Sequence, residues 1–330
     1  MTRTHPLSRT DIYQVVALAV RAPSIHNTQP WSIHADTDSL EVWADRNRQL
    51  PVTDPDGWAL RVSCGALVFG LRLALVTYGW DSTVTLLPDS HEPDLLAHVK
   101  LTEQRVATPL EQRLGRAVPL RRSNRYPFAD SPVPKPVLEA ISAAAAAENC
   151  WIRTLQDRIQ VVQVAELVRE ASQHLTARPG YQEELTSWIH DHGSDGVPRR
   201  AGGPAPEPQD LLPFRNFGGR SRAVGGEYEP WPLLAVLGTS QDRPFADLRA
   251  GQALYRVLLT LTHHGLAASM FSQPIEDGPS RTRLAELVGR PADYPQMVLR
   301  IGYGMPVPAS PRRPVEEVIT FTGALASPIG

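Results

Sequence analysis

Two short stretches of this sequence concentrate side chains that can bind a phosphate or another oxygen-rich ligand. The first, RAPSIHNTQPW, spans residues 21–31, and the second, LRRSNRYPF, spans residues 120–128. Forked guanidinium groups bind phosphate in a bidentate manner, and a short hydroxyl helps to orient it. The candidate phosphate ligands in the second stretch are Arg121, Arg122, Ser123 and Arg125.

Taken alone, the arginine cluster also fits an ordinary basic turn in solvent. Only Lys100 and Lys135 are lysines, and every other basic residue of the chain is an arginine. This bias spreads arginine through the whole sequence, so a basic turn is the favoured interpretation of the second stretch by itself.

The first stretch is too polar for a core strand and too broken for the interior of a helix. Pro23 ends the preceding helix. The short donors and acceptors of Ser24, Asn27 and Gln29 can then face a ligand. For His26, a ligand contact and a structural hydrogen bond are equally good interpretations.

Other catalytic patterns are missing from the sequence. It contains no Walker-type phosphate loop, no HExxH zinc motif and no Gly-x-Ser-x-Gly elbow. GYGMPV at 302–307 lacks the third glycine of a dinucleotide fingerprint. The histidines at 190, 192, 263 and 264 lack the cysteine or carboxylate spacing of a metal site. We therefore expect no metal site and name no catalytic acid or base.

The composition indicates a folded protein with no electrostatic attraction to nucleic acid or anionic membranes. The 330 residues are 42% hydrophobic and 21% charged, with a formal net charge of -2. Two isolated cysteines, Cys64 and Cys150, make no disulfide framework. The first residues lack the apolar run of a signal peptide. We expect a cytoplasmic protein that binds neither nucleic acid nor membrane.

Hydrophobic periodicity predicts alternating helices and strands around these stretches. Two long apolar helices are expected at 59–78 and 248–264, and Gly65 and Gly79 of the first match Gly251 and Gly265 of the second. These matches fit an internal duplication and chance equally well. Further helices are expected at 11–20, 108–118, 131–148 and 159–175, and strands at 31–34, 40–43, 82–87, 98–101, 151–155, 233–238 and 297–301.

Residues 193–232, here called the Gly/Pro segment, form a long run without a regular pattern. Glycine and proline make up 15 of its 40 residues. A run of this length is typical of a functional loop or of a disordered linker. Embedded apolar residues favour the loop: Leu211, Leu212, Phe214, Phe217, Tyr228 and Trp231.

Four stretches of the chain resemble motifs of the flavin-dependent nitroreductase family. RRSNRYPFADSPVPKPVLEAI resembles the opening of that family, whose Arg-x-Ser-x-Arg/Lys motif holds the FMN phosphate. APSIHNTQPW resembles the motif that reaches the flavin across the dimer interface. QPIED, with Pro274, Ile275 and Glu276, resembles the segment whose backbone approaches the flavin ring. SPRRPVEEV, with Arg312 and Arg313, resembles the C-terminal basic element near the phosphate.

The order of these motifs differs from that of ordinary family members. There the arginine motif comes first and the Pro-Ser-Asn-Gln motif follows it shortly afterwards. Here the Pro-Ser-Asn-Gln motif comes first, and the arginine motif follows about a hundred residues later. The resemblance implies two related halves, 1–118 and 119–330, each keeping the motif that the other has lost. This arrangement resembles the Acg-like branch of the family.

The resemblance implies an α+β nitroreductase-like fold whose fused halves form a pseudo-dimer, with mainly antiparallel sheets flanked by helices. Such a chain would be a monomer that mimics a homodimer and binds one FMN through Pro23, Ser24, His26, Asn27 and Gln29 together with the arginine motif. The Gly/Pro segment is a candidate lid over the flavin. NAD(P)H is the electron donor that the family implies.

The expected activity is the reduction or dehydrogenation of a small organic molecule through flavin N5. Two alternatives belong to other classes of protein. One is an FMN storage or sequestering protein with little turnover, and the other is an arginine-rich regulatory binding module without flavin.

Overall fold

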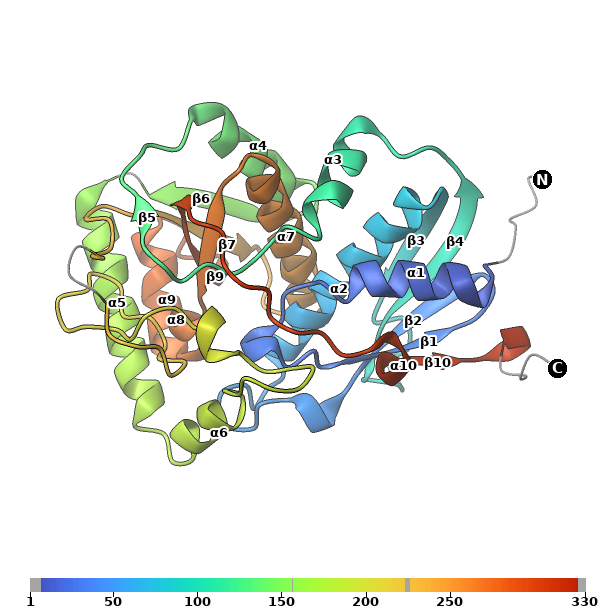
Figure 1. Ribbon diagram of the computed structural model, residues 1–330, viewed down its shortest axis with the longest axis horizontal. Helices are drawn as coiled ribbons and strands as arrows, with labels where there is room; N and C mark the ends of the chain where they lie inside the picture. Colours follow the sequence, from blue (N-terminus) through green and yellow to red (C-terminus); the bar gives the residue numbers. More distant parts are fainter. Residues whose placement is uncertain (1–6, 156, 223–225, 326–330) are drawn as a thin grey trace.

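The structure, a computed structural model, describes residues 7–155, 157–222 and 226–325. Two lobes lie on either side of a pair of long helices, α2 and α7 (Figure 1). The strands are β1 Trp31–Ala35, β2 Ser39–Ala44, β3 Trp80–Leu86, β4 Leu95–Gln104, β5 Phe128–Ala129, β6 Trp151–Leu155, β7 Leu233–Thr239, β8 Ala267–Phe271, β9 Tyr294–Gly304 and β10 Ile319–Phe321.

Helices cover the sheets and connect their strands. The α-helices are α1 Arg9–Ala19, α2 Trp58–Thr77, α3 Pro109–Ala117, α4 Lys135–Ala146, α5 Arg158–Thr176, α6 Tyr181–Ser187, α7 Pro244–His263, α8 Gln273–Glu276, α9 Gly278–Leu287 and α10 Val315–Val318. Short 3-10 turns lie at Ile25–Asn27, Arg46–Arg48, Arg199–Ala201 and Gly323–Leu325.

The two sheets repeat one pairing pattern. In the first sheet β1 pairs with β2, β2 with β4 and β4 with β3, all antiparallel. In the second sheet β6 pairs with β7, β7 with β9 and β9 with β8, again all antiparallel. Strands that correspond in chain order therefore occupy corresponding positions, which is the structural signature of two related halves.

The last strand joins the two lobes. After β9 the chain crosses to the other lobe, where β10 pairs in parallel with β1 (Figure 1). The pairing brings Ile319 opposite Ile33. The first sheet thus depends on a strand from the far end of the sequence, and the crossing residues run close to the 21–31 stretch.

Helices α2 and α7 pack through glycines that contact each other's backbone. A Cβ atom on Gly65 would lie 2.1 Å from the carbonyl oxygen of Leu248, and one on Gly251 would lie 2.0 Å from that of Val62. With Gly65 matched to Gly251, Val62 matches Leu248, so the contact is the same in both directions. This reciprocity is that of a two-fold interface.

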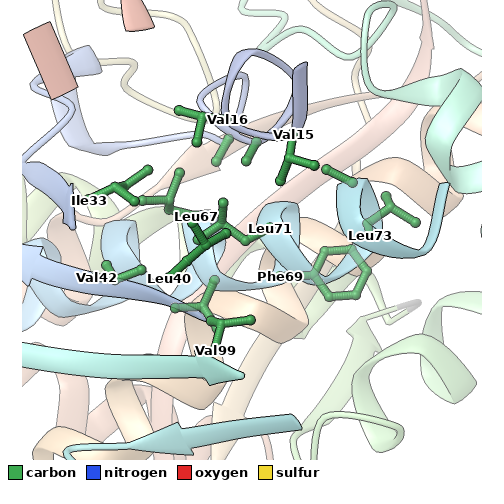
Figure 2. Packing of buried hydrophobic residues seen from close by; sticks show 14 of the residues in the cluster. Val15, Val16, Ile33, Leu40, Val42, Leu67, Phe69, Leu71, Leu73 and Val99 are labelled. Atoms are coloured by element: carbon green, nitrogen blue, oxygen red, sulfur yellow. The ribbon is translucent and has the colours of Figure 1, made fainter. Parts of the chain in front are cut away.

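The core of the first lobe forms between α1, α2 and one face of the first sheet. Figure 2 shows Val15 and Val16 of α1 above Leu67 and Leu71 of α2, with Val99 of β4 below. Helix α2 is long and apolar enough to cross a bilayer, but 89% of its most apolar stretch is buried inside the fold, as in a core helix.

The structure confirms the predicted α+β class, the two related halves and the mainly antiparallel sheets. The helix expected at 248–264 begins earlier, because Pro244 suits a first helical turn. Several short elements have no counterpart in the sequence prediction, because two to seven residues carry too little periodicity. They are α6, α8, α10, β5, β8 and β10. The ten-residue helix α9 was not predicted either.

Candidate ligand site between the two lobes

Two adjoining cavities lie where the lobes meet and share the walls Pro23, Ser24, Arg125 and Met270. One, here called the arginine cradle, is lined by basic residues. The other, here called the apolar cavity, is lined mainly by aromatic and aliphatic side chains. Together they form one continuous site with a positive end and an apolar end.

The arginine cradle collects guanidinium groups without an acidic counter-ion. None of them forms an ion pair with a carboxylate among the residues that the structure describes. Of the predicted ligands, Arg121 is almost fully buried and Arg125 is partly buried, and burial lowers the pKa of both. The guanidinium residues that line the cradle are Arg21, Arg121, Arg122, Arg125 and Arg312.

Several donors in the cradle lack an acceptor or have only neutral ones. Nε and Nη1 of Arg121 have no partner within the described chain. Arg125 donates to the carbonyl of Ala201 at 3.0 Å, and burial with the neighbouring charge of Arg215 lowers its pKa to about 10. Burying cations without anions is unfavourable, so the cradle is built to receive an anion.

Pairing with β8 positions the arginine motif. Asn124 donates its backbone N–H to the carbonyl of Ala268 at 2.9 Å, and Ser269 Oγ donates to the carbonyl of Asn124 at 2.7 Å. Ser123 also bridges to Ala268 and lines the cradle beside the arginines. These contacts attach the loop between α3 and α4 to the edge of the second sheet.

The loop after α1 follows an unusual backbone path. His26, Asn27 and Gln29 have φ angles of 45°, 58° and 50°, in the left-handed region that non-glycine residues seldom adopt. Ser24 stabilises this path, because its Oγ accepts the backbone N–H of Gln29 at 3.0 Å. Strained backbone of this kind concentrates at functional sites.

The loop side chains also bind the crossing segment. Asn27 lines the cradle, donates to the carbonyl of Gly196 at 2.9 Å and accepts from Arg312 Nη1 at 2.8 Å. The other donors of Arg312 go mostly to main-chain carbonyls, and burial with the positive charge of Arg121 lowers its pKa to about 9. Arg312 therefore closes the cradle from the crossing segment.

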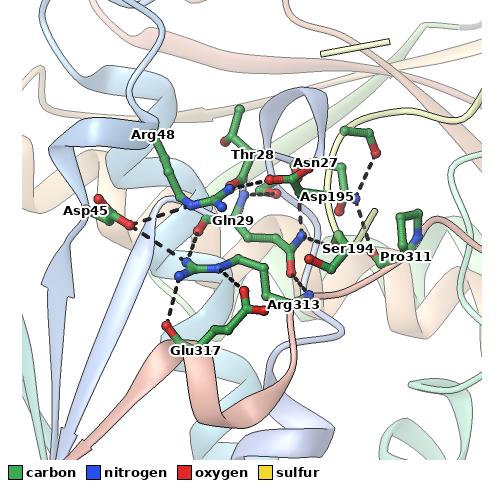
Figure 3. Close-up of polar contacts among 12 residues, drawn as sticks. Asn27, Thr28, Gln29, Asp45, Arg48, Ser194, Asp195, Pro311, Arg313 and Glu317 are labelled. Carbon is green, nitrogen blue, oxygen red and sulfur yellow. Dashed lines mark hydrogen bonds and ion pairs between the residues drawn. The ribbon is translucent and has the colours of Figure 1, made fainter. Parts of the chain in front are cut away.

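Five predicted residues lie outside the lining of both cavities, and two of them belong to the first loop and to the crossing segment. The side chain of Gln29 donates to the carbonyl of Ser194 at 3.0 Å and accepts the backbone N–H of Arg313 at 2.9 Å (Figure 3). Arg313 turns toward Asp45 and Glu317. In this structure Gln29 and Arg313 connect the first loop, the crossing segment and the Gly/Pro segment.

The apolar cavity takes its walls from both lobes and from the Gly/Pro segment. Helix α2 supplies Ser63, whose Oγ accepts the backbone N–H of Ile25 at 3.2 Å. The apolar residues of its lining are Ile25, Trp58, Ala59, Val62, Phe214, Phe217, Leu254, Met270, Phe271 and Met297. A cavity with these walls suits a flat, largely apolar ligand.

A buried polar chain crosses the apolar cavity. Arg215 of the Gly/Pro segment lies 2.5 Å from His26 Nε2 and forms an ion pair with Glu276 at 2.7 Å. Arginine cannot accept a hydrogen bond, so neutral His26 accepts at Nε2 and carries its proton on Nδ1. Burial, followed by the charges of Arg215 and Arg125, holds the pKa of His26 well below its usual range.

The QPIED segment contributes less directly to the cavity. Gln273 lines the apolar cavity, whereas Pro274 and Ile275 are buried and do not appear in its lining. Glu276 does not line the cavity either, and it forms an ion pair with Arg215, which does.

The Gly/Pro segment is fixed over the site by buried contacts at its far end. Glu229 forms an ion pair with Arg300 at 2.5 Å, and both side chains are almost fully buried. Phe214 stacks on Tyr228 with ring centroids 4.9 Å apart. Residues 223–225 of the candidate lid lie outside the described residues. Before this gap Arg222 forms an ion pair with Asp210 at 2.5 Å, and after it the Tyr228 hydroxyl donates to the carbonyl of Arg125 at 2.8 Å.

Sequence reasoning missed Arg21 and Arg215 as lining residues of the site. Arg21 stands directly before the Pro-Ser-Asn motif, so its position next to a recognised motif was a usable signal. Arg215 lies in a segment without pattern, among many other arginines. Only the folded path of the Gly/Pro segment brings it to His26 and Glu276.

Comparison with curated proteins reveals relatives in Mycobacterium tuberculosis. The chain is 35% identical over 328 residues to "Putative NAD(P)H nitroreductase Rv3131", an alignment that covers 96% of this chain and 93% of the relative. It is 30% identical over 324 residues to "Putative NAD(P)H nitroreductase acg", covering 94% and 95%. The chain matches no protein-family profile.

Comparison with solved structures reveals more distant similarities. A nitroreductase with bound FMN from Desulfitobacterium hafniense is 14% identical, with a TM-score of 0.41, and covers 64% of this chain and 98% of that one. The FMN and NADPH-dependent nitroreductase NfnB from a Sphingopyxis strain is 21% identical, with a TM-score of 0.42, and covers 64% and 99%. At these scores the family assignment depends on the sequence relatives.

Proposed function

The chain belongs to the nitroreductase family, and from this premise we propose that it binds one FMN between its halves and is an oxidoreductase of small organic molecules. One observation carries the proposal: a cradle of arginines without a counter-ion opens into an apolar cavity that shares its walls. An anionic end joined to a flat apolar end is the shape of FMN.

The residues of the site fit the three parts of this cofactor. Arg121, Ser123 and Arg125, with Arg122 and Arg312, would hold the phosphate through charge-assisted hydrogen bonds. Ser24, which lines both cavities, and Asn27, which lines the cradle, would face the ribityl chain. The aromatic and methionine walls would enclose the ring system.

We propose one flavin per chain because the equivalent position in the other half is altered. The division proposed from the motifs remains 1–118 and 119–330, with β10 exchanged into the first sheet. Ser63, which lines the apolar cavity, corresponds to Arg249 on α7. The Arg249 guanidinium lies 4.2 Å from the Phe245 ring centroid. A long charged side chain in place of a serine would obstruct a second flavin.

Bound FMN supplies hydride transfer through its N5 atom, and the protein positions and tunes that chemistry. The family names make NAD(P)H the proposed electron donor and a small molecule the proposed substrate. The chain's own residues bind the phosphate, enclose the ring and exclude water. We assign no general acid or base. We further propose that the protein is a cytoplasmic monomer that binds neither nucleic acid nor membrane.

One observation favours the second candidate, an FMN storage protein with little turnover. The Gly/Pro segment covers the apolar cavity with Phe214, Arg215 and Phe217, and buried ion pairs to Glu276 and Arg300 fix it there. A lid fixed this firmly would restrict access to the flavin.

Anaerobic reduction tests both candidates. Purified protein should be yellow and should contain one FMN per chain. Bleaching by NADH or NADPH, followed by reoxidation with a small acceptor, would support the enzyme. Bleaching only by dithionite would support storage, and two equivalent flavins per chain would contradict the single-site proposal.

A further inference from the structure

The two ring nitrogens of His26 have different surroundings. His26 lines the apolar cavity and is only 6% exposed. Its Nε2 atom accepts a hydrogen bond from Arg215 Nη1 at 2.5 Å, whereas its Nδ1 atom is buried without a partner among the residues that the structure describes. Most buried polar groups in proteins are hydrogen-bonded, so the Nδ1 atom requires an explanation.

The unpartnered nitrogen carries the proton of the neutral ring. Arginine can only donate, so its contact with Nε2 leaves the N–H group on Nδ1. Burial, followed by the positive charges of Arg215 and Arg125, lowers the pKa of His26 and keeps the ring neutral. A wall residue of the apolar cavity thus carries a buried donor for which the described part of the chain supplies no acceptor.

The imidazole is held in place by its backbone and by two side chains. The backbone N–H of the preceding residue, Ile25, donates to Ser63 Oγ on α2 at 3.2 Å. Phe217 packs edge-on against the imidazole with ring centroids 5.7 Å apart, and Arg215 holds Nε2. A donor fixed in this way loses little conformational entropy when it binds a ligand.

His26 lies on the side of the apolar cavity that the Gly/Pro segment covers. Its neighbours Arg215 and Phe217 both belong to that segment, and both line the same cavity. His26 does not line the arginine cradle, where the FMN phosphate would bind. With the flavin ring in the apolar cavity, a substrate stacked on the ring would lie between it and the Gly/Pro segment. The free donor of His26 is therefore suited to the substrate.

A buried donor in an apolar cavity selects among flat ligands. A few polar groups orient the ligand in such cavities, and a molecule without an acceptor leaves the donor unpaired. We propose that His26 is a specificity-determining residue, donating its Nδ1–H to an oxygen atom of a flat electron acceptor with a nitro or quinone group. The inference rests on the proposed function, because it requires FMN in the site.

The variants His26→Gln and His26→Asn separate the two nitrogens. The Gln amide reaches the position of Nε2 and can accept from Arg215, but the donor at Nδ1 is lost. The Asn amide places a donor near the position of Nδ1 and does not reach Arg215. The probes are nitrobenzene and toluene, which has the same ring but no oxygen. Oxidised, FMN-loaded protein does not reduce nitrobenzene, so the flavin absorbance reports binding alone.

His26→Gln should weaken nitrobenzene binding about tenfold and leave toluene and FMN binding within about twofold of wild type. His26→Asn should keep nitrobenzene affinity within about twofold. It should instead lower the melting temperature of flavin-free protein, because Arg215 loses its acceptor.

Unchanged nitrobenzene affinity in His26→Gln would overturn the inference and leave the proposed function intact. Equal weakening of nitrobenzene and toluene would also overturn it, since His26 would then support only the shape of the cavity. Weaker FMN binding in His26→Gln would assign the donor to the flavin, against the inference. Wild-type protein that binds no FMN would overturn both the inference and the proposed function.

Nitrogen-15 NMR of the histidine rings tests the contact without a substitution. In FMN-loaded wild-type protein, nitrobenzene should shift the Nδ1 resonance of His26, and toluene should not. Equal shifts with the two ligands, or none with nitrobenzene, would contradict the hydrogen bond.

Discussion

At the scale of single residues, the cradle's positive charges are expected to stabilise the ligand rather than the fold. Replacing Arg121 and Arg125 together with Gln removes two charge-assisted hydrogen bonds, each worth about 1.5–3 kcal/mol. FMN should bind roughly a hundredfold more weakly. Since neither guanidinium has an acidic partner among the described residues, the unfolding free energy of flavin-free protein should not fall.

The matched control is Arg113→Gln with Arg116→Gln, which makes the same charge change on the exposed face of α3. Titration of both double variants with FMN, alongside urea unfolding, measures the two effects separately. A cradle variant that loses stability but keeps its FMN affinity would show that the arginines are structural.

Arg215 has a different role, because it is paired. Arg215→Gln leaves Glu276 buried without a counter-charge, which should cost about 3–5 kcal/mol of unfolding free energy. The double variant with Glu276→Gln should regain part of this loss, since no charge is then left buried. Urea unfolding of the two variants and of Glu276→Gln completes the cycle, and additive losses would contradict the pairing.

The same substitution should change the protonation of His26. Arg215 contributes to holding the pKa of His26 well below its usual range, so its removal should raise that pKa toward the ordinary value. Burial remains in the variant, and the shift should be partial. NMR titration of the histidine ring protons in Arg215→Gln measures it, with an unchanged pKa as the contrary outcome.

At the scale of elements, long apolar helices and both ligand motifs could be predicted, and the short connecting elements could not. The glycine spacing of the helices at 59–78 and 248–264 fits duplication and chance equally well, and the reciprocal contact between α2 and α7 supports duplication. The three residues of β10 form a strand only because β1 lies beside them, at the other end of the sequence. No local pattern carries that information.

The roles of individual polar residues were harder to predict for the same reason. Gln29 belongs to a ligand motif by sequence, yet its side chain forms hydrogen bonds with the main chain of Ser194 and Arg313. Asn27, expected to face the ligand, also donates to the carbonyl of Gly196 and accepts a hydrogen bond from Arg312. Asn27→Ala is therefore expected to lower stability as well as FMN affinity.

If the Gly/Pro segment is a lid, as we propose, it is the element that would decide between turnover and storage. Phe217 lines the apolar cavity and packs under the Arg125 guanidinium, which lies 4.5 Å from its ring centroid. Phe217→Ala should open a path to the ring and increase the rate of flavin reduction by dithionite several-fold. Trp231→Ala is the control, since Trp231 lies in the same segment but is half exposed and outside both cavities.

Stopped-flow absorbance of the flavin-loaded variants gives these rates. Equal rates in wild-type protein and Phe217→Ala, with FMN retained in both, would eliminate the lid role. Replacing residues 202–229 with a short Gly/Ser linker is the larger version of this test, and it removes residues 223–225 as well.

At the scale of the whole molecule, fusion of two related halves would explain why the proposed flavin site is complete in one position and altered in the equivalent one. In a symmetric dimer every substitution changes both sites at once. In a single chain, each half can keep one motif and lose the other, as the positions of RAPSIHNTQPW and LRRSNRYPF indicate. Asymmetric pairs such as Ser63 with Arg249 then become possible.

The close contact between α2 and α7 holds this arrangement together, and it can be tested from both sides. Gly65→Ala and Gly251→Ala each place a Cβ within about 2 Å of a backbone carbonyl on the facing helix. Backbone atoms cannot move aside as a flexible side chain can, so each change should cost about 1–3 kcal/mol of unfolding free energy. The two losses should be similar, because each glycine meets the equivalent residue of the other half.

Gly278→Ala, with no atom within 4 Å of the new Cβ, is the control. Both helices line the apolar cavity, so the two variants should also weaken FMN binding; a loss confined to one glycine would contradict the two-fold relation.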